Sequence, residues 1–104
     1  MIPGVEIKPG ACVIGLQAVM VRGCITIGTV YAAMGYRCTL TSGVDGQHSP
    51  RSRHYLGLAA DFRTRDILVG TRTALRDAIA SRLGQDFDVI LESDHLHVEW
   101  DPKP

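Results

Sequence analysis

The chain has 104 residues, a length that suits one domain built around a single hydrophobic core. Hydrophobic residues make up 45% of it and charged residues 21%, which excludes an intrinsically disordered chain. Eleven Lys and Arg balance eleven Asp and Glu, and this zero net charge argues against nucleic-acid binding through a general basic field.

The first half of the chain predicts one helix and one strand. Residues 11–34 are apolar on most sides and predict a largely buried helix, although interior glycines favour a break near Gly23. Gly35 suits the C-cap of this helix, and the alternating run 36–41 predicts a strand that stops at residues 42–43. The uncharged runs are shorter than the ~20 residues that a spanning helix needs, so no membrane span is predicted.

The second half predicts a long loop, a helix and three strands. Residues 44–53 have loop composition, and the end of the segment 55–62 is compatible with a core strand. A helix is expected over 71–83, with Thr71 as its N-cap and Gly84 just past its end. Two strands, 87–91 and 96–100, follow with a polar turn between them. The expected fold is one α+β domain spanning residues 1–104, in which two helices cover one face of a small antiparallel sheet.

Three cysteines and the N-terminal residues bear on the cellular compartment. Cys12, Cys24 and Cys38 are an odd number without a Cys-x-x-Cys pair, so we expect free thiols. The N-terminal segment lacks the charged region and the cleavage site of a secretory signal peptide. We therefore expect synthesis in the cytoplasm, with any export by another route.

All four histidines lie in the second half of the chain, at positions 48, 54, 95 and 97. Residues two apart in a strand share a face, so His95, His97 and Glu99 are expected opposite the core-facing Leu96, Val98 and Trp100. Imidazole and carboxylate groups are natural zinc ligands, and a catalytic zinc takes three of them. His54 and Asp61 are brought together if the chain turns at Gly57 and then enters a strand.

Two motifs resemble those of a known family. Residues 52–61 match Ser-x-His-x-x-Gly-x-Ala-x-Asp, and residues 94–97 match Asp-His-x-His. In this order they resemble the zinc D-alanyl-D-alanine carboxypeptidase and L-alanyl-D-glutamate peptidase family, which includes bacteriophage endolysins and has a Hedgehog-like fold. The resemblance implies that His54, Asp61 and His97 hold one zinc ion per chain, that Asp94 is the general base and that His95 assists beside the metal.

The resemblance also implies the substrate class. We expect a monomeric, endolysin-like zinc metallopeptidase that cuts the L-alanyl-D-glutamate bond in the stem peptide of peptidoglycan and reaches the cell wall after release by another route. The alternatives are a D-alanyl-D-alanine carboxypeptidase, or a non-catalytic virion or binding module that retains zinc on the same fold. The presence of Asp94 favours an enzyme over such a module.

One substrate-binding position departs from the family pattern. Family members often carry an arginine shortly after the Ser-Gly that ends the first strand, whereas here Val44 and Asp45 follow. The residues that could take over this role are Arg37, Arg51 and Arg53. His48 either contacts the substrate or only fills the loop.

Other charged residues near the motifs admit two interpretations. Arg63 and Arg65 either grip substrate carboxylates or pair with the acidic C-terminal segment. Glu92 and Glu99 either orient the ligand histidines or are solvated strand residues, and we expect the latter.

Overall fold

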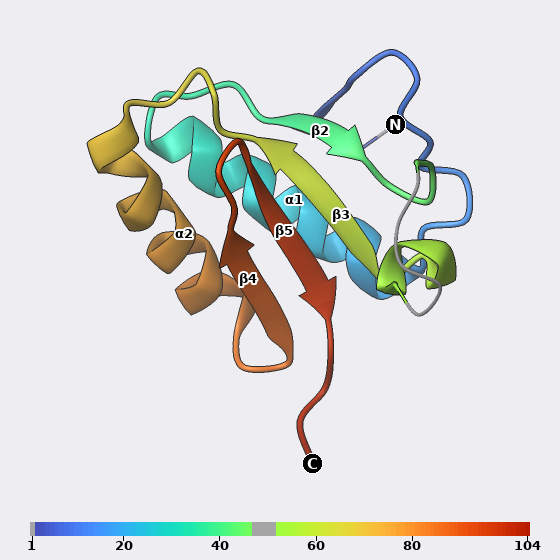
Figure 1. The fold of residues 1–104 in the computed structure, drawn as a ribbon. Coiled ribbons are helices and arrows are strands. Elements are labelled where there is room, and N and C mark those ends of the chain that lie inside the picture. Colours follow the sequence, from blue (N-terminus) through green and yellow to red (C-terminus); the bar gives the residue numbers. More distant parts are fainter. Residues whose placement is uncertain (1, 47–51) are drawn as a thin grey trace.

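The computed structural model describes residues 2–46 and 52–104. Within these ranges the elements follow in the order β1 (Glu6–Ile7), α1 (Ala18–Ala33), β2 (Thr39–Ser42), the 3-10 helix η1 (Arg53–Leu56), β3 (Ala59–Arg63), α2 (Val69–Leu83), β4 (Phe87–Leu91) and β5 (His95–Trp100). The protein is therefore an α+β domain, as predicted (Figure 1). Neither α-helix of the described residues has the length and apolar content to cross a bilayer.

The five strands form one mixed sheet in the order β1-β2-β3-β5-β4. Three of the four strand pairs are antiparallel, whereas β1 runs parallel to β2. The prediction of an antiparallel sheet was therefore wrong at one edge. β1 has only two residues, Glu6 and Ile7, which is too short for a recognisable alternation, and its pairing partner lies far along the chain.

Both helices cover the same face of the sheet, as expected (Figure 1). Alternate residues of the strands point into this layer, so β3 contributes Phe62 while β5 contributes Leu96 and Val98. From the helices, the buried side chains packed in the same core are Met20, Cys24, Ile27, Val30, Tyr31, Leu75 and Ile79. The intervening strand residues therefore lie on an open face that neither helix covers.

Helix α1 differs from the sequence expectation at its start and in its middle. It begins at Ala18, and the preceding Gln17 instead bonds η1, with its amide donating to the Leu56 carbonyl (2.7 Å). The helix continues through Gly23, where the expected break does not occur. A Cβ at position 23 would lie 3.2 Å from the ring of Phe87, so glycine here allows strand β4 to pack closely against the helix.

Helix α2 begins earlier than its capping pattern suggested. Its N-cap is Leu68, which provides no side-chain cap hydrogen bond, so the assignment of Thr71 as the N-cap was wrong. The guanidinium of Arg72 donates to the carbonyl of Ile67 (3.0 Å) and ties the first turn to the preceding loop. The end of the helix was predicted correctly: Gly84 follows with a φ of +89°, a conformation that favours glycine.

All three cysteines lie in the described residues and are free thiols. Cys24 and Cys38 are buried in the core, and Cys12 is partly buried. Burial raises the pKa of the Cys24 and Cys38 thiols to about 12, so both stay protonated. They pack as small apolar side chains.

Candidate metal centre

The register between β3 and β5 assembles most of the candidate site. Asp61 lies directly opposite His97, and the neighbouring pair on the same face joins Arg63 to His95. Both pairs point away from the helices, because Phe62 and Leu96, between them in the strands, face the core. The predicted convergence of His95 and His97 on one surface is therefore confirmed.

His54 reaches this surface from η1, the short helix before β3. Its backbone N–H donates to the hydroxyl of Ser52 (3.2 Å), which caps the helix start. The chain then turns at Gly57, whose φ is +72°. A Cβ there would lie 2.1 Å from the carbonyl oxygen of Gly15, so only glycine fits. The predicted turn at this glycine brings His54 beside Asp61.

The ring of His54 is fixed by a backbone acceptor. The side chain is 2% exposed, and its Nδ1 lies 2.6 Å from the carbonyl oxygen of Gly43. Because Nδ1–H donates to this oxygen, Nε2 is the nitrogen that could bind a metal. The carboxylate of Asp45 accepts from the N–H of Gly43 (2.8 Å) and from that of Cys12 (2.7 Å), which holds the acceptor loop in place.

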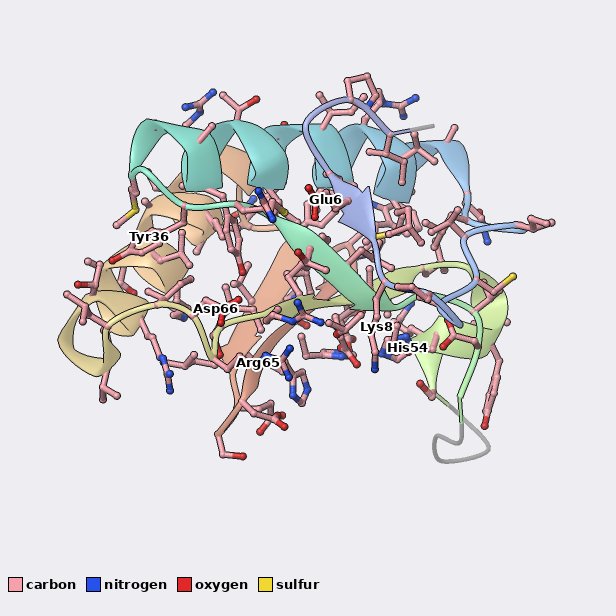
Figure 2. All side chains as sticks on the ribbon, turned by 90° about the horizontal axis from the view of Figure 1, so that it is seen from above. Glu6, Lys8, Tyr36, His54, Arg65 and Asp66 are labelled. Atoms are coloured by element: carbon pink, nitrogen blue, oxygen red, sulfur yellow. The ribbon has the colours of Figure 1, made fainter. Side chains whose placement is uncertain are left out.

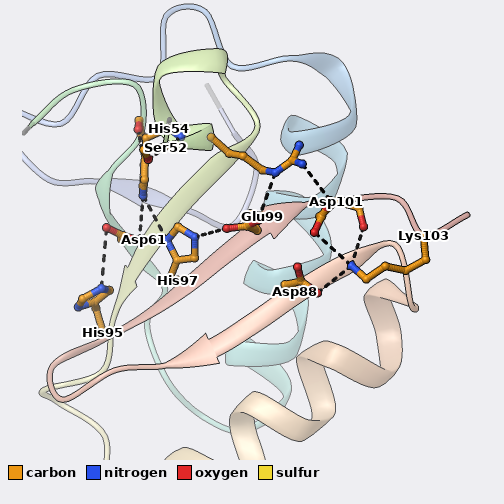
Figure 3. A network of polar contacts seen from close by, with 11 residues as sticks. Ser52, His54, Asp61, Asp88, His95, His97, Glu99, Asp101 and Lys103 are labelled. Atoms are coloured by element: carbon orange, nitrogen blue, oxygen red, sulfur yellow. Dashed lines mark hydrogen bonds and ion pairs between the residues drawn. The ribbon is translucent and has the colours of Figure 1, made fainter. Parts of the chain in front are cut away.

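Three potential ligand atoms meet at the centre of the site (Figure 3). The Nε2 atom of His54 lies 3.3 Å from Nδ1 of His97 and 3.3 Å from Oδ1 of Asp61, and the last two atoms are 3.0 Å apart. Zinc–nitrogen and zinc–oxygen bonds of about 2.0–2.1 Å at tetrahedral angles place ligand atoms about 3.3 Å apart. His54, Asp61 and His97 can thus hold a metal ion.

Glu99 orients His97 from the opposite side of the ring. Its Oε1 lies 2.8 Å from Nε2 of His97, so Nε2–H donates to this carboxylate and Nδ1 faces the other two ligands. Arg53 in turn pairs with Glu99 (3.3 Å) and with Asp101 (2.9 Å). The expectation that Glu99 is a solvated strand residue was wrong, because its side chain is only 21% exposed. Glu92, by contrast, is exposed as expected.

A second acidic group, Asp88, Glu99 and Asp101, lies next to this contact. Its three negative charges are partly offset by Arg53 and by Lys103, whose ammonium pairs with Asp88 (2.9 Å) and Asp101 (3.4 Å) (Figure 3). This group therefore acts as an ion-pair network that joins the C-terminal segment to the sheet.

The charges of the candidate ligands are strongly coupled. Burial would raise the pKa of Asp61, but its polar contacts with His54 and His97 outweigh it and hold the pKa well below its usual range. The hydrogen bond to Asp61, with that to Glu99, raises the pKa of His97 to about 9 against the opposing effect of burial. Without a metal, His97 is thus a cation between two carboxylates.

The metal-free protein should lose stability as the pH rises. A His97 pKa raised from 6.5 to about 9 stabilises the fold fully below pH 6.5, and this contribution disappears as the pH passes through 9. We expect a loss of up to about 3 kcal/mol over this window. Thermal unfolding of chelator-treated protein between pH 6 and 9.5 measures it. His97→Gln is the control and should show a flatter profile, so parallel profiles would contradict the assignment.

Asp94 and His95 form a pair beside the candidate ligands. Nδ1 of His95 lies 2.7 Å from Oδ1 of Asp94, and its Nε2 lies 3.9 Å from Oδ2 of Asp61. The hydrogen bond from His95, with its charge, lowers the pKa of Asp94, which therefore remains ionised at neutral pH. The Asp94 side chain is 78% exposed, and its contact with His95 links it to the ligand group.

A cleft of about 250 Å³ opens beside this pair, on the uncovered face of the sheet. It is lined by Lys8, Thr41, Asp61, Arg63, Arg65, Asp94 and His95. Figure 2 shows Lys8, His54 and Arg65 on the side of the sheet away from α1. One candidate ligand, the proposed base and its neighbouring histidine therefore share a cavity with three cationic side chains.

Of the residues named from the sequence as candidate substrate contacts, Arg63 and Arg65 line this cleft, whereas Arg37 and Arg53 do not. Arg37 is exposed and pairs with Glu6 (3.4 Å) at the β1 edge of the sheet, and Arg53 is engaged by Glu99 and Asp101. His48 and Arg51 lie outside the described residues. Lys8 was not considered from the sequence, because nothing in its local pattern links it to motifs more than forty residues away.

Comparison of the chain with known protein families and with curated protein sequences found no match.

Proposed function

We propose that this protein is a zinc-dependent peptidase of the Hedgehog-like zinc peptidase fold, acting on the stem peptide of bacterial peptidoglycan. The observation that carries the proposal is the meeting of His54 Nε2, Asp61 Oδ1 and His97 Nδ1 at separations of 3.0–3.3 Å, next to the Asp94–His95 pair. The second nitrogen of each ligand histidine already donates to a protein oxygen, so once Nδ1 of His97 gives up its proton to make way for a metal, both rings and Oδ1 of Asp61 can direct lone pairs at one point. Such a point calls for a cation.

The remaining groups suit the hydrolysis of an amide. A bound zinc ion supplies Lewis acidity, which lowers the pKa of water and polarises a carbonyl. Asp94 is ionised and lines the cleft, so its carboxylate can accept the proton of the attacking water. His95 is oriented by Asp94 through Nδ1, which leaves its Nε2 directed towards Asp61. When protonated, that nitrogen can donate to the oxyanion that develops on the substrate.

The substrate class rests on the resemblance of residues 52–61 and 94–97 to the zinc peptidase family. The L-alanyl-D-glutamate bond is the first candidate. D-Alanyl-D-alanine carboxypeptidase activity is the second, because Lys8, Arg63 and Arg65 line the cleft and a terminal carboxylate flanks the bond that such an enzyme cuts.

Metal analysis and product masses test the proposal together. Protein purified without added zinc should contain about one zinc per chain, since three ligands define one mononuclear site. Incubation with purified muropeptides should give either the masses of cleavage after L-alanine or the loss of a terminal D-alanine. Zinc content near zero that added zinc does not raise would reject the metal centre. One bound zinc with unchanged muropeptides would instead indicate a non-catalytic module.

A further inference from the structure

Three cationic side chains line the cleft without an acidic partner among the described residues. Among the described residues, no carboxylate pairs with the side chains of Lys8, Arg63 or Arg65. The other arrangement expected for Arg63 and Arg65, pairing with the acidic C-terminal segment, is therefore absent from this part of the structure. In that segment Asp101 instead pairs with Arg53 and Lys103, and Asp88 pairs with Lys103.

The carboxylates of the same cleft are already engaged. Oδ1 of Asp61 contacts His54 and His97, and Oδ1 of Asp94 contacts His95. The lining side chains still carry one more cation than carboxylates, and a divalent metal on the ligand group would add two further positive charges. The whole chain has a net charge of zero, so this local excess arises from the way the fold gathers the charges.

The three cations come from separate segments that the sheet brings together. Lys8 follows β1, Arg63 ends β3 opposite His95, and Arg65 lies in the turn after β3. Like charges gathered on one cavity repel one another unless an anion joins them. Guanidinium groups bind carboxylates with two parallel hydrogen bonds, which suits a planar acid on the substrate.

We infer that Lys8, Arg63 and Arg65 form a carboxylate-binding subsite that selects a substrate with a free carboxylate close to the bond that is cut. The inference deepens the proposed function and rests on it for the position of the bond. It predicts that the preferred muropeptides are those whose carboxylates are free and not amidated.

Equilibrium binding separates this subsite from catalysis. The probes are one muropeptide with free carboxylates and the same muropeptide with its carboxylates converted to amides, titrated onto zinc-loaded Asp94→Asn protein so that turnover does not consume them. We expect the free acid to bind at least about tenfold more tightly, the effect of one charge-assisted hydrogen bond. Adding Lys8→Gln and Arg65→Gln should reduce this preference to below about threefold. Both side chains are exposed, so folding should be unaffected.

The matched control is the double variant Arg22→Gln, Arg82→Gln in the same background. It removes the same number of charges from a separate hollow between α1 and α2, and these arginines are exposed and also lack a carboxylate partner among the described residues. The control should keep the full preference for the free acid. An equal preference in both double variants, or equal affinity of parent protein for acid and amide, would overturn the subsite. So would failure of the acid to bind at millimolar concentration. Selective binding without hydrolysis by the parent would reject the peptidase and leave the subsite standing.

Discussion

The double variant His54→Ala, His97→Ala should contain almost no zinc and should show no measurable muropeptide hydrolysis. The two rings supply two of the three converging ligand atoms, and Asp61 alone is a weak site for a divalent ion. Zinc content after dialysis and product masses measure the two losses. Because metal that binds only the folded state stabilises it, added zinc should raise the melting temperature of the parent and not that of the variant.

His95→Ala is the control for this experiment. Its Nε2 lies 3.9 Å from Oδ2 of Asp61, outside the group of three atoms that face one another, so the variant should keep about one zinc. Activity should fall in the control as well, because the variant loses the proposed oxyanion donor and the partner of Asp94. Metal retained by the His54→Ala, His97→Ala protein at the parent level would show that the metal lies elsewhere.

The Asp94→Asn variant should keep its zinc, and its rate of muropeptide hydrolysis should fall by about 10²–10⁴-fold, the usual contribution of a general base. The amide oxygen can still accept the hydrogen bond from Nδ1 of His95, so the geometry of the pair is preserved. What the amide cannot do is accept a proton from water. Turnover of muropeptides by zinc-loaded protein at saturating substrate measures the loss.

Glu92→Gln is the matched control for the Asp94 variant. Glu92 is the other carboxylate of the turn between β4 and β5, but it is exposed and does not line the cleft. We expect the Glu92→Gln variant to hydrolyse muropeptides at the rate of the parent protein. Asp94→Asn activity within about threefold of the parent, well inside the range for a base, would remove Asp94 from that role. A large loss in Glu92→Gln would then identify the base.

Local patterns were enough to predict the strands that carry the candidate ligands. The alternation in 95–100 places His95, His97 and Glu99 on one face because side chains of a strand alternate, whatever the strand pairs with. In the same way, Gly57 marks a turn because its positive φ is a property of that residue and its immediate neighbours. The grouping of His54 and Asp61 with His97 was instead implied by the resemblance of residues 52–61 and 94–97 to the zinc peptidase family, and the register of β3 with β5 brings the three together.

Contacts between distant segments were beyond such patterns. Glu99 also pairs with Arg53, which lies 3.3 Å from it but 46 positions earlier, and this distant contact, together with the one to His97, is why Glu99 is not a solvated residue. A larger residue at Gly23, in the middle of α1, would crowd the ring of Phe87. Helix propensity alone does not predict this contact.

The sequence by itself determined the α+β class and the face of β5 that carries the histidines, because each depends on residues close together in the chain or on a periodic pattern, while the three candidate ligands came from the resemblance of two motifs to a known family. Only the tertiary structure decided that β1 runs parallel to β2, and with it that Lys8 arrives beside Arg63 and Arg65. Strand order is set by which apolar faces pack together over the whole core, and a two-residue edge strand leaves no periodic trace. The excess positive charge of the cleft therefore arises because the fold brings cationic residues from separate segments together.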